Sequence, residues 1–268
     1  STPIGNLDDI TLRSIEVLKQ SNIILCEDTR RSFKLLEHLN IKKKLVSYHK
    51  FNEKKELHKV IQYLNEGKIL SLISDAGTPI LSDPGNLLIN KCIEENIKIF
   101  PIPGPSAITA SVSISGFNDK FLFFGFLPKT EKDLEKKLLS LKEIDFTLVF
   151  FISGIKINFY LKYFKKFFSG RNILIAREIS KMHETFYRES IDNIKLFTSP
   201  LKGELTVVVS KKISKSESLD ISYIKKQAKN YLEKYTLKDV VELISKKEKI
   251  SKNKIYKIFF NIKKNEKN

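Results

Sequence analysis

The chain has 268 residues, of which 41% are hydrophobic, and a formal net charge of +17. This length and composition allow a substantial buried core, and we expect two domains rather than one. No segment approaches the roughly 18 apolar residues that a membrane-spanning helix needs. The sequence also lacks the charged start followed by an apolar segment that is typical of a signal peptide. The two cysteines, Cys26 and Cys92, lie in apolar contexts that fit buried thiols and give no disulfide framework. We therefore expect a soluble, cytoplasmic protein.

Positive charge is concentrated at the C-terminal end of the chain. Residues 211–268 contain 17 Lys and 7 acidic residues, so they carry +10 of the total charge. A basic module of this kind is typical of a protein that binds a phosphate backbone, and it favours a nucleic-acid partner. Because 42 of the 48 basic residues are Lys, a Lys-rich surface that only confers solubility remains an alternative.

Short apolar runs alternate with amphipathic stretches through the first 117 residues. One such stretch, residues 57–64, carries its apolar side chains at helical spacing. Strands that alternate with helices predict a parallel or mostly parallel sheet. We expect its strands at residues 22–26, 44–48, 68–74 and 97–102.

Residues 118–213 have a different, aromatic-rich rhythm that predicts a second α+β domain beginning near residues 115–119. Its strands are expected at residues 121–126, 146–152, 172–176, 184–190 and 205–210, with helices at 134–141 and 155–164.

The tail, residues 214–268, is expected to form three short helices with outward lysines. The apolar positions that mark them are Ile224, Ala228, Tyr231, Leu232 and Tyr235, then Leu237, Val240, Val241 and Ile244, and finally Ile255, Ile258, Phe259 and Ile262. Thr236 with Asp239, and Ser251 before the third helix, fit N-caps. Helix-turn-helix packing and a simple helical cap are both compatible with this spacing.

Four loops of the first domain are rich in Pro, Gly and polar residues. They read STPIGNLDDIT (1–11), CEDTRRS (26–32), SDAGTPILSDPG (74–85) and PIPGPSAITAS (101–111). Loops that leave the carboxyl ends of parallel strands meet at one edge of the sheet, where ligands bind. Glycines there permit close backbone approach, and Asp75, Thr78 and Ser106 supply hydrogen-bonding groups. Four ordinary tight turns are the alternative, but their common edge favours a binding site.

Several chemistries are excluded by missing motifs. The sequence has no G-x-x-x-x-G-K-[ST] phosphate loop, no G-x-G-x-x-G after a strand and no metal-ligand spacing among its four His and two Cys. The PGPSA stretch lacks the second Gly of a nucleophile elbow. These absences argue against a nucleotide triphosphatase, a dinucleotide dehydrogenase, a zinc enzyme and a serine hydrolase.

Six ordered motifs closely resemble the ribosomal RNA small subunit methyltransferase I family, which has the tetrapyrrole-methylase fold. The motifs are TPIGNLDDIT, CEDTRRSFKLL, SDAGTPILSDPG, PIPGPSAITAS, IAREISKMHETF and KGELTVVVS, and the tail segment SKNKIYKIFF is similar as well. The resemblance implies an α/β fold of two domains with a cofactor cleft between them, plus a small C-terminal helical module. It also implies S-adenosylmethionine-dependent 2'-O-methylation of a cytidine ribose in the decoding region of 16S rRNA. A homodimer that acts on 16S rRNA or the small ribosomal subunit, without a metal, is expected.

The resemblance further implies roles for individual residues. Cofactor-binding residues are expected to be Pro3, Ile4, Asp75, Ala76, Gly77, Thr78, Leu81, Ser106, Ala107 and Ile152, with Ile152 near the adenine. Glu27, Asp28 and Arg30 are expected on the substrate side, where one carboxylate orders or deprotonates the 2'-hydroxyl and Arg30 holds a phosphate. The alternative for the two carboxylates is a helix N-cap paired with Arg30 or Arg31.

The sequence departs from the family pattern in two places. The apolar strand that normally precedes TPIGN is not present, so the first sheet is expected to lack a strand. The stretch ISGIK, residues 152–156, keeps only Ser153 and the basic Lys156 of a Glu-Ser-Pro-His-Arg-like motif. Two alternative functions therefore stay open. A small-molecule, tetrapyrrole-type methyltransferase would have no use for the basic tail, and an RNA-binding protein with a decayed cofactor site would not need its intact loops.

Overall fold

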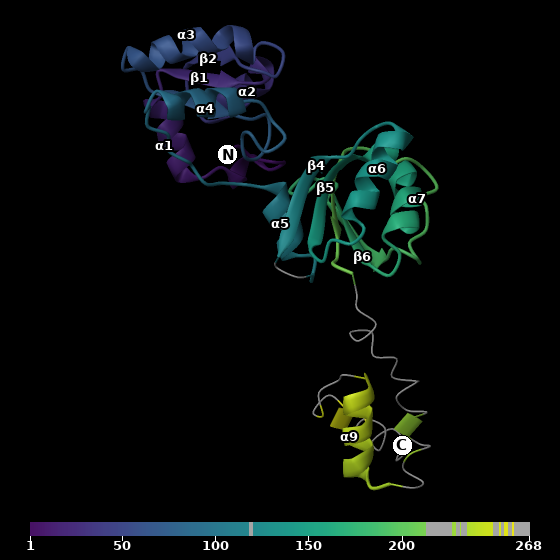
Figure 1. Ribbon diagram of the computed structural model, residues 1–268. Helices are drawn as coiled ribbons and strands as arrows, with labels where there is room; N and C mark the ends of the chain where they lie inside the picture. Colours follow the sequence, from purple (N-terminus) through teal and green to yellow (C-terminus); the bar gives the residue numbers. More distant parts are fainter. Residues whose placement is uncertain are drawn as a thin grey trace. The chain divides into compact units, whose positions relative to one another are not determined.

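The chain forms two compact units, Ser1–Lys211 and Lys212–Asn268 (Figure 1). The computed structural model describes residues 1–117, 120–212, 227–228, 231, 235–248, 252, 255–256 and 259. The first unit contains both predicted sheets, and the second contains the basic tail. Within the described residues, no helix is both long and apolar enough to cross a membrane.

A small parallel sheet forms the centre of the N-terminal half. Its strands are β1 (Ile23–Cys26), β2 (Lys44–Ser47) and β3 (Leu70–Ile73), in the order β2-β1-β3. A short 3-10 turn η1 (Leu7–Asp9) and α1 (Leu12–Gln20) precede the strands, α2 (Thr29–His38) and α3 (Glu53–Asn65) connect them, and α4 (Asn86–Glu94) follows β3. The first three predicted strands and the parallel sheet are confirmed.

The side chains of β1 alternate between two separate cores, as the pleat of a strand requires. Ile23 and Leu25 pack with α3 and α4, and Ile24 and Cys26 pack with α1 and α2. Both cysteines are buried free thiols, as predicted. The sheet is therefore covered on both faces, which leaves its loop edge available for a site.

Residues 97–102 do not form the strand that their apolar pattern predicts. The segment has no regular secondary structure, and Phe100 is 71% exposed. A strand needs a hydrogen-bonded neighbour, and among the described residues the long-range backbone contact of this segment is the Ser1 amino group, 3.3 Å from the Ile102 carbonyl oxygen. Apolar content alone was therefore a misleading signal here.

The second sheet has five strands in the order β4-β5-β8-β6-β7. They are β4 (Phe121–Phe126), β5 (Thr147–Ser153), β6 (Asn172–Arg177), β7 (Thr185–Ser190) and β8 (Glu204–Val209). Among these strands β4 and β5 pair in parallel, and the other three pairs are antiparallel. All five predicted strands are confirmed to within one or two residues.

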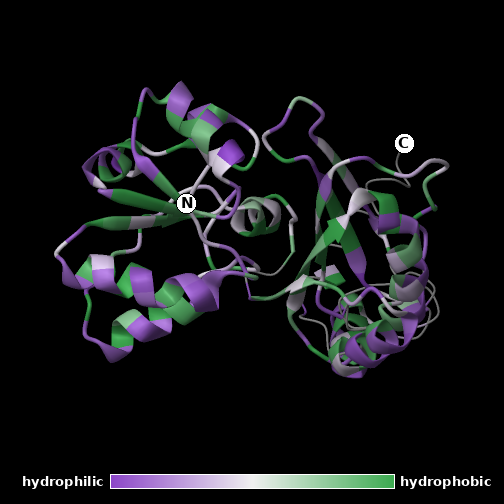
Figure 2. Cartoon of the chain, turned by 90° about the horizontal axis from the view of Figure 1, so that it is seen from above, coloured by the Kyte–Doolittle hydropathy of each residue, from purple (hydrophilic) through white to green (hydrophobic). Residues whose placement is uncertain are grey.

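Helices cover both faces of this second sheet. On one face α6 (Glu131–Leu141) and α7 (Ile157–Phe167), which follows the short η2 (Gly154–Lys156), bury the largest core. On the other face α5 (Ala107–Ser113) packs through Ile108 against Val149, Leu174 and Val208. Hydrophobic strands run between helices with hydrophilic outer sides, which Figure 2 shows. Since α5 follows directly on the loop 101–106, it brings the first domain's loops to the second sheet.

The basic tail contains α9 (Leu237–Glu248), the second of its three predicted helices. The Thr236 hydroxyl accepts the Asp239 N–H at 3.4 Å, which confirms this N-cap. The buried face of α9 packs on other described tail residues in a core formed by Ala228, Val240, Val241, Ile244, Ile255 and Phe259. Ile224, Leu232, Ser251, Ile258 and Ile262, and part of the boundary at residues 115–119, lie outside the described residues. The tail thus has its own apolar core.

Candidate functional site

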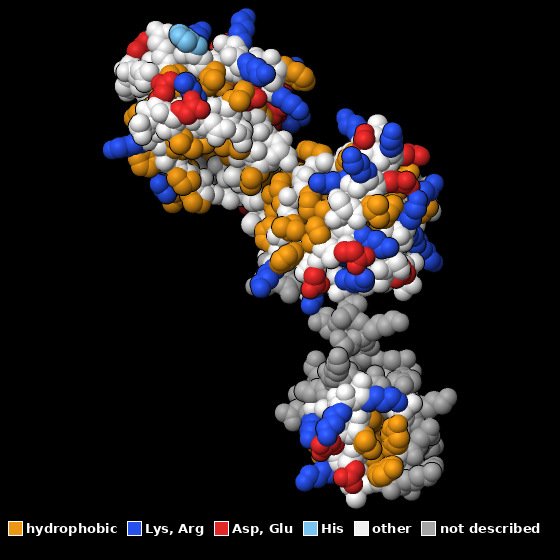
Figure 3. Space-filling model, viewed as in Figure 1, with side chains coloured by type: hydrophobic (Ala, Val, Ile, Leu, Met, Phe, Trp, Pro, Cys, Tyr) orange, Lys and Arg blue, Asp and Glu red, His pale blue; other side chains and the backbone are white. Residues whose placement is uncertain are grey.

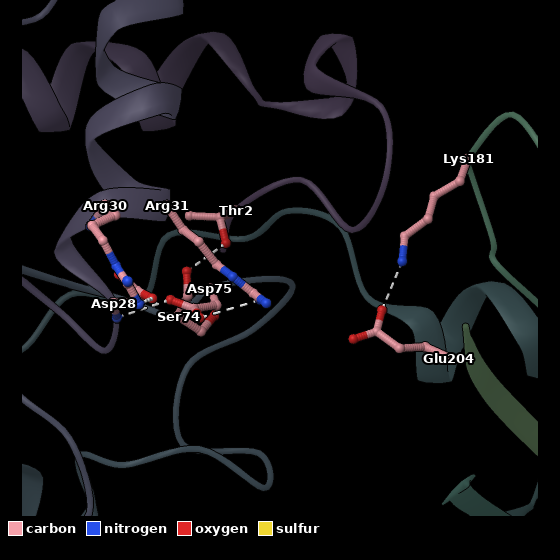
Figure 4. A network of polar contacts seen from close by, with 8 residues as sticks. All are labelled: Thr2, Asp28, Arg30, Arg31, Ser74, Asp75, Lys181 and Glu204. Carbon is pink, nitrogen blue, oxygen red and sulfur yellow. Dashed lines mark hydrogen bonds and ion pairs between the residues drawn. The ribbon is translucent and has the colours of Figure 1, made fainter. Parts of the chain in front are cut away.

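The loop that follows β3, residues 74–85, is tied to the start of the chain. Thr2 and Gly77 exchange two backbone hydrogen bonds of 2.9 Å each, and the Thr2 hydroxyl donates to the Ser74 carbonyl oxygen at 2.9 Å (Figure 4). The hydroxyls of Ser1 and Thr78 lie 3.0 Å apart. Two of the four predicted site loops are thereby held together by hydrogen bonds.

The same loop bends sharply and contacts the second sheet. Ile80 and Ser82 adopt positive φ angles of 75° and 73°, a conformation that costs energy for a β-branched residue and is typical of functional sites. Ser82 lies against a bulge in β4 at Gly125, where a Cβ atom would come within 2.5 Å of the serine oxygen. Gly125 therefore permits the close approach between this loop and the second domain.

The two domains of the first unit enclose a cavity of about 240 Å³. Its walls are mostly apolar, with polar groups at a few places, which is typical of a small-molecule site. The lining residues from the first domain are Ile4, Ala76, Gly77, Thr78, Leu81, Asp83, Ser106, Ala107 and Ile108. Those from the second are Phe126, Phe151, Ile152, Ser153, Ala176, Glu178, Ile179, Lys181 and residues 203–206.

Most of the predicted cofactor-binding residues lie together in this cavity. Eight of the ten line it, namely Ile4, Ala76, Gly77, Thr78, Leu81, Ser106, Ala107 and Ile152. Pro3 is not among the lining residues. Its neighbour Ile4 lines the cavity, and its other neighbour Thr2 is hydrogen-bonded to Ser74. Asp75 faces a second hollow instead. Whether these residues bind the cofactor stays a prediction, but their convergence follows from the loop argument.

A charged network on the second-domain wall was not singled out from the sequence. The Lys181 ammonium lies 2.8 Å from the Glu204 carboxylate (Figure 4). It also lies 3.0 Å from the Glu178 carboxylate. Burial opposes the charge of Lys181, but its two carboxylate partners outweigh this and raise its pKa. The Glu204 backbone N–H also donates to Glu178 at 2.8 Å. These residues belong to the motifs IAREISKMHETF and KGELTVVVS, on which the family resemblance rests. Their place near the site could therefore be expected from the sequence, but their pairing could not.

The β6–β7 loop reaches the N-terminal loop beside the cavity. The Asn6 N–H donates to the Ser180 hydroxyl at 3.1 Å, and that hydroxyl donates to Asp9. Since Lys181 follows directly in the chain, the same contact fixes the charged network against the first domain.

Glu27, Asp28 and Arg30 line a second, more open hollow of about 510 Å³. Its other lining residues are Thr29, Arg31, Ser47, His49, Lys50, Phe51 and Asp75. Asp75 belongs to this hollow and Ala76 to the cavity, so the two sites adjoin at one peptide bond of the loop 74–85. The predicted substrate side therefore adjoins the predicted cofactor side.

The charges of the second hollow are organised in two ion pairs. Arg30 contacts Asp28 at 2.8 Å, and Arg31 contacts Asp75 at 3.4 Å. Hydrogen bonds from the Arg30 side chain and backbone hold the pKa of Asp28 well below its usual range. Asp28 is also the N-cap of α2. The structural alternative for Asp28 is thus confirmed, and a catalytic role for it stays a prediction.

Asp83 is a partly buried carboxylate in the cavity that the sequence analysis did not single out. Burial raises its pKa to about 6, and the nearby charges of Glu27 and Asp75 add to the shift. Its side chain has no hydrogen bond or ion pair among the described contacts, unlike Asp28 and Asp75. Perturbed carboxylates in a cleft are candidates for acid–base work. The only sequence signal was its place inside the motif SDPG.

The unusual stretch ISGIK packs tightly beside the cavity. Ser153 lines it, and the buried Gly154 donates its N–H to the Gly203 carbonyl oxygen at 3.0 Å. A Cβ atom at Gly154 would collide with the Leu201 carbonyl oxygen. The departure from the family pattern therefore coincides with a close approach of two backbone segments.

Comparison with known proteins agrees with this architecture. The sequence profile of Tetrapyrrole (Corrin/Porphyrin) Methylases matches residues 1–195. Among solved structures, the methyltransferase CobJ superposes with a TM-score of 0.58 at 16% identity, over 77% of this chain and 90% of that chain. A uroporphyrin-III-C-methyltransferase from Thermus thermophilus gives a TM-score of 0.52 at 15% identity, over 77% and 90%. The fold and its interdomain cavity thus define a methyltransferase of the tetrapyrrole-methylase class.

Curated relatives narrow the class further. Proteins named ribosomal RNA small subunit methyltransferase I are 43% identical in Mesomycoplasma conjunctivae, over 81% of this chain and 91% of theirs, and 43% identical in Thermotoga maritima, over 79% and 96%. The protein of that name from Buchnera aphidicola is 38% identical over 95% of this chain and 93% of its own. The chain belongs to the ribosomal RNA small subunit methyltransferase I family, and the expected resemblance and fold class are confirmed.

Proposed function

We propose that this protein transfers a methyl group from S-adenosylmethionine to the 2'-hydroxyl of a cytidine ribose in the decoding region of 16S rRNA. The names of the relatives support the small-subunit rRNA as substrate. The observation that carries the proposal is the adjoining of two sites, an apolar cavity and an open polar hollow, at residues 75 and 76. A small cofactor and a large substrate would meet at this junction.

The residues of the cavity fit S-adenosylmethionine. Ile4, Leu81 and Ile152 offer apolar contact for an adenine, while Thr78 and Ser106 offer hydroxyls for polar ends. The cofactor supplies a methyl group on a sulfonium, whose charge is lost in the transfer. An apolar cavity favours that loss, because burial disfavours a charge.

Asp83 is our candidate for the group that accepts the proton of the 2'-hydroxyl. The proton moves from the ribose oxygen to the carboxylate, while the oxygen forms its bond to the methyl carbon and the carbon–sulfur bond breaks. Asp83 lines the cavity and has no described ion pair, whereas the carboxylate of Asp28 forms an ion pair with Arg30. Its raised pKa makes it a better base near neutral pH. Asp28 and Arg30 would then hold the substrate rather than take the proton.

Further parts of the molecule suit the proposed partners. The basic tail would contact the phosphate backbone of 16S rRNA or of the small ribosomal subunit. A homodimer is also proposed. It is supported by hydrophobic side chains that gather over α5 and β4, as Figure 3 shows. In this part of the sequence Ile114, Phe121 and Leu122 are 38%, 36% and 36% exposed. Because β4 ends the sheet, its edge is open to a partner.

The decisive experiment maps ribose methylation on small ribosomal subunits incubated with the protein and S-adenosylmethionine. We expect one cytidine of the decoding region to become resistant to alkaline cleavage, and no product from tetrapyrrole substrates. Methylation of a base, or of a tetrapyrrole alone, would refute the proposal.

A further inference from the structure

The loop between β2 and α3 presents an aromatic ring to solvent at the second hollow. Phe51 is 94% exposed and lines that hollow together with His49 and Lys50. Most large apolar side chains bury their surface on folding, since exposure costs free energy in proportion to area. Single exposed apolar residues are common, so Phe51 needs further support before it indicates a site.

The loop is held in one conformation by its own hydrogen bonds. The Asn52 carboxamide accepts the His49 N–H at 2.7 Å and donates to the Ser47 carbonyl oxygen at 3.0 Å. The Phe51 N–H donates to the His49 ring at 3.2 Å, and the two rings meet edge to face with centroids 6.1 Å apart. The backbone that carries Phe51 is therefore held in place, which lowers the entropy lost when a ligand stacks on the ring.

The polar side chains of the hollow are of both signs. Arg30, Arg31 and Lys50 oppose Glu27, Asp28 and Asp75. A phosphate site would be dominated by cations, but here donors and acceptors are balanced. The edge of a nucleobase carries donors and acceptors side by side, and its face stacks on an aromatic ring. Balanced polarity beside an exposed Phe thus fits a base better than a phosphate.

We propose that the second hollow holds an unpaired base of the RNA substrate, stacked on the face of Phe51. This inference rests on the proposed function and names the subsite that recognises the nucleotide. The hollow adjoins the cavity at residues 75 and 76, about 3.8 Å apart along the chain. In this proposal the ribose of the bound base lies at the junction, beside the cavity. Lys50 and the two arginines contact the edge of the base or the adjacent backbone.

A fluorescent variant tests stacking directly, because the chain contains no Trp. Phe51→Trp places a single indole in the hollow, and we expect short oligocytidylate RNA to quench its emission at low salt. Phe100→Trp is the matched control, since Phe100 is also exposed but does not line either site. Quenching at position 51 and not at position 100 supports the proposal. Equal quenching at both positions, or none at position 51, overturns it.

Activity provides a second, independent readout. Phe51→Ala should weaken the apparent affinity for RNA about tenfold or more, in line with the loss of one stacked base, while S-adenosylmethionine affinity stays the same. Phe51→Tyr keeps an aromatic face and should bind like the parent, whereas Phe51→Leu should resemble Phe51→Ala. If Leu restores binding as well as Tyr does, the contact is only apolar and the stacking proposal is wrong.

The outcomes separate this proposal from the proposed function. Quenching of the Phe51→Trp variant by RNA without any ribose methylation by the parent would leave the base subsite standing and refute the methyl transfer. Ribose methylation by the parent that Phe51 substitutions do not change would support the methyl transfer and refute the base subsite. Quenching by polyphosphate as strong as that by RNA would identify an anion site, and loss of activity on intact subunits without RNA quenching would identify a protein contact. Either of these last two results overturns the base subsite.

Discussion

The Asp28 carboxylate holds Arg30 through three contacts, accepting its backbone N–H at 2.9 Å, its Nε at 3.1 Å and its Nη2 at 2.8 Å. One aspartate thus begins α2 and fixes the direction of a guanidinium at the second hollow. The side chain of Arg30 is 87% exposed, so this geometry is available to a ligand without rearrangement.

Substitutions of Asp28 and Arg30 should reduce methyl transfer to the substrate without changing the affinity for the cofactor. Asp28→Asn keeps a good N-cap but loses the charge that orients Arg30, and Arg30→Ala removes the cation. We expect both to depress methyl transfer to small subunits several-fold or more, with S-adenosylmethionine affinity by calorimetry nearly unchanged. Equal loss of cofactor binding in both variants would show that the loop is structural.

Thr78→Arg should abolish cofactor binding by filling the cavity. Thr78 lines it, so the much longer arginine side chain is expected to occupy part of its volume. Ser140→Arg, on an exposed position of α6 outside the cavity lining, is the control and should bind like the parent. Calorimetric titration compares the three proteins. Normal affinity in Thr78→Arg would mean that the cofactor binds elsewhere.

Asp83→Asn should remove a pH dependence of the reaction. A base with a pKa raised to about 6 is ionised above that value, so the parent's single-turnover rate should rise as pH increases through about 6 and then level off. The variant should be slower by about a hundredfold or more and should lack this limb. Asp145→Asn, an exposed carboxylate outside both sites, should leave the profile as it is. An unchanged profile in Asp83→Asn would assign the base to another group.

The same variant should be more stable than the parent at neutral pH. Because the folded-state pKa of Asp83 is raised above its usual 3.8, the group favours the folded state below that value, and this advantage is lost as pH rises toward about 6. Above pH 6 the parent carries a charge that burial disfavours, and Asn does not. We expect a higher melting temperature for Asp83→Asn at pH 7 and a smaller difference at pH 4. A lower melting temperature at pH 7 would contradict the burial argument.

Gly154→Ala should destabilise the protein. The added Cβ meets the Leu201 carbonyl oxygen, which is backbone and cannot rotate away, and overpacking of this kind costs about 1–3 kcal/mol. Urea unfolding should show a lower midpoint with an unchanged slope. An unaltered midpoint would mean that the segment 201–203 moves freely to admit the methyl group.

The sequence predicted the elements well wherever the local pattern and the tertiary partners agreed. Most of the strands β1 to β8 are apolar runs between turn residues, and each has a neighbouring strand. Residues 97–102 have the same pattern, but the structure offers them no described neighbouring strand, and a strand without a partner does not form. Pairing is a property of the whole fold, so no local reading could detect this failure.

The candidate site was only partly predictable for a similar reason. The loop that contains Gly77 and Thr78 could be predicted from the sequence, because Pro and Gly mark sharp bends. By contrast, Lys181 and Glu204 look like ordinary surface charges until β6 and β8 bring them within 2.8 Å. The exposure of Phe51 could not be predicted, because the sequence does not distinguish an exposed phenylalanine from a buried one.

Removal of the basic tail should flatten the salt dependence of RNA binding. Residues 211–268 carry +10, and lysines that neutralise phosphates release counterions, so log affinity falls linearly with log salt by about one unit of slope per contact. The tail is a separate compact unit with its own buried residues Val240 and Ile244, so its removal should leave the cavity and S-adenosylmethionine affinity intact. Phosphate contacts position an RNA without reading its sequence, so the truncated protein should bind every RNA more weakly yet keep some preference for its target. The measurement compares the RNA affinity of full-length and truncated protein across a salt series. An unchanged slope would show that these lysines do not contact RNA, and the charge argument for a nucleic-acid partner would then fail.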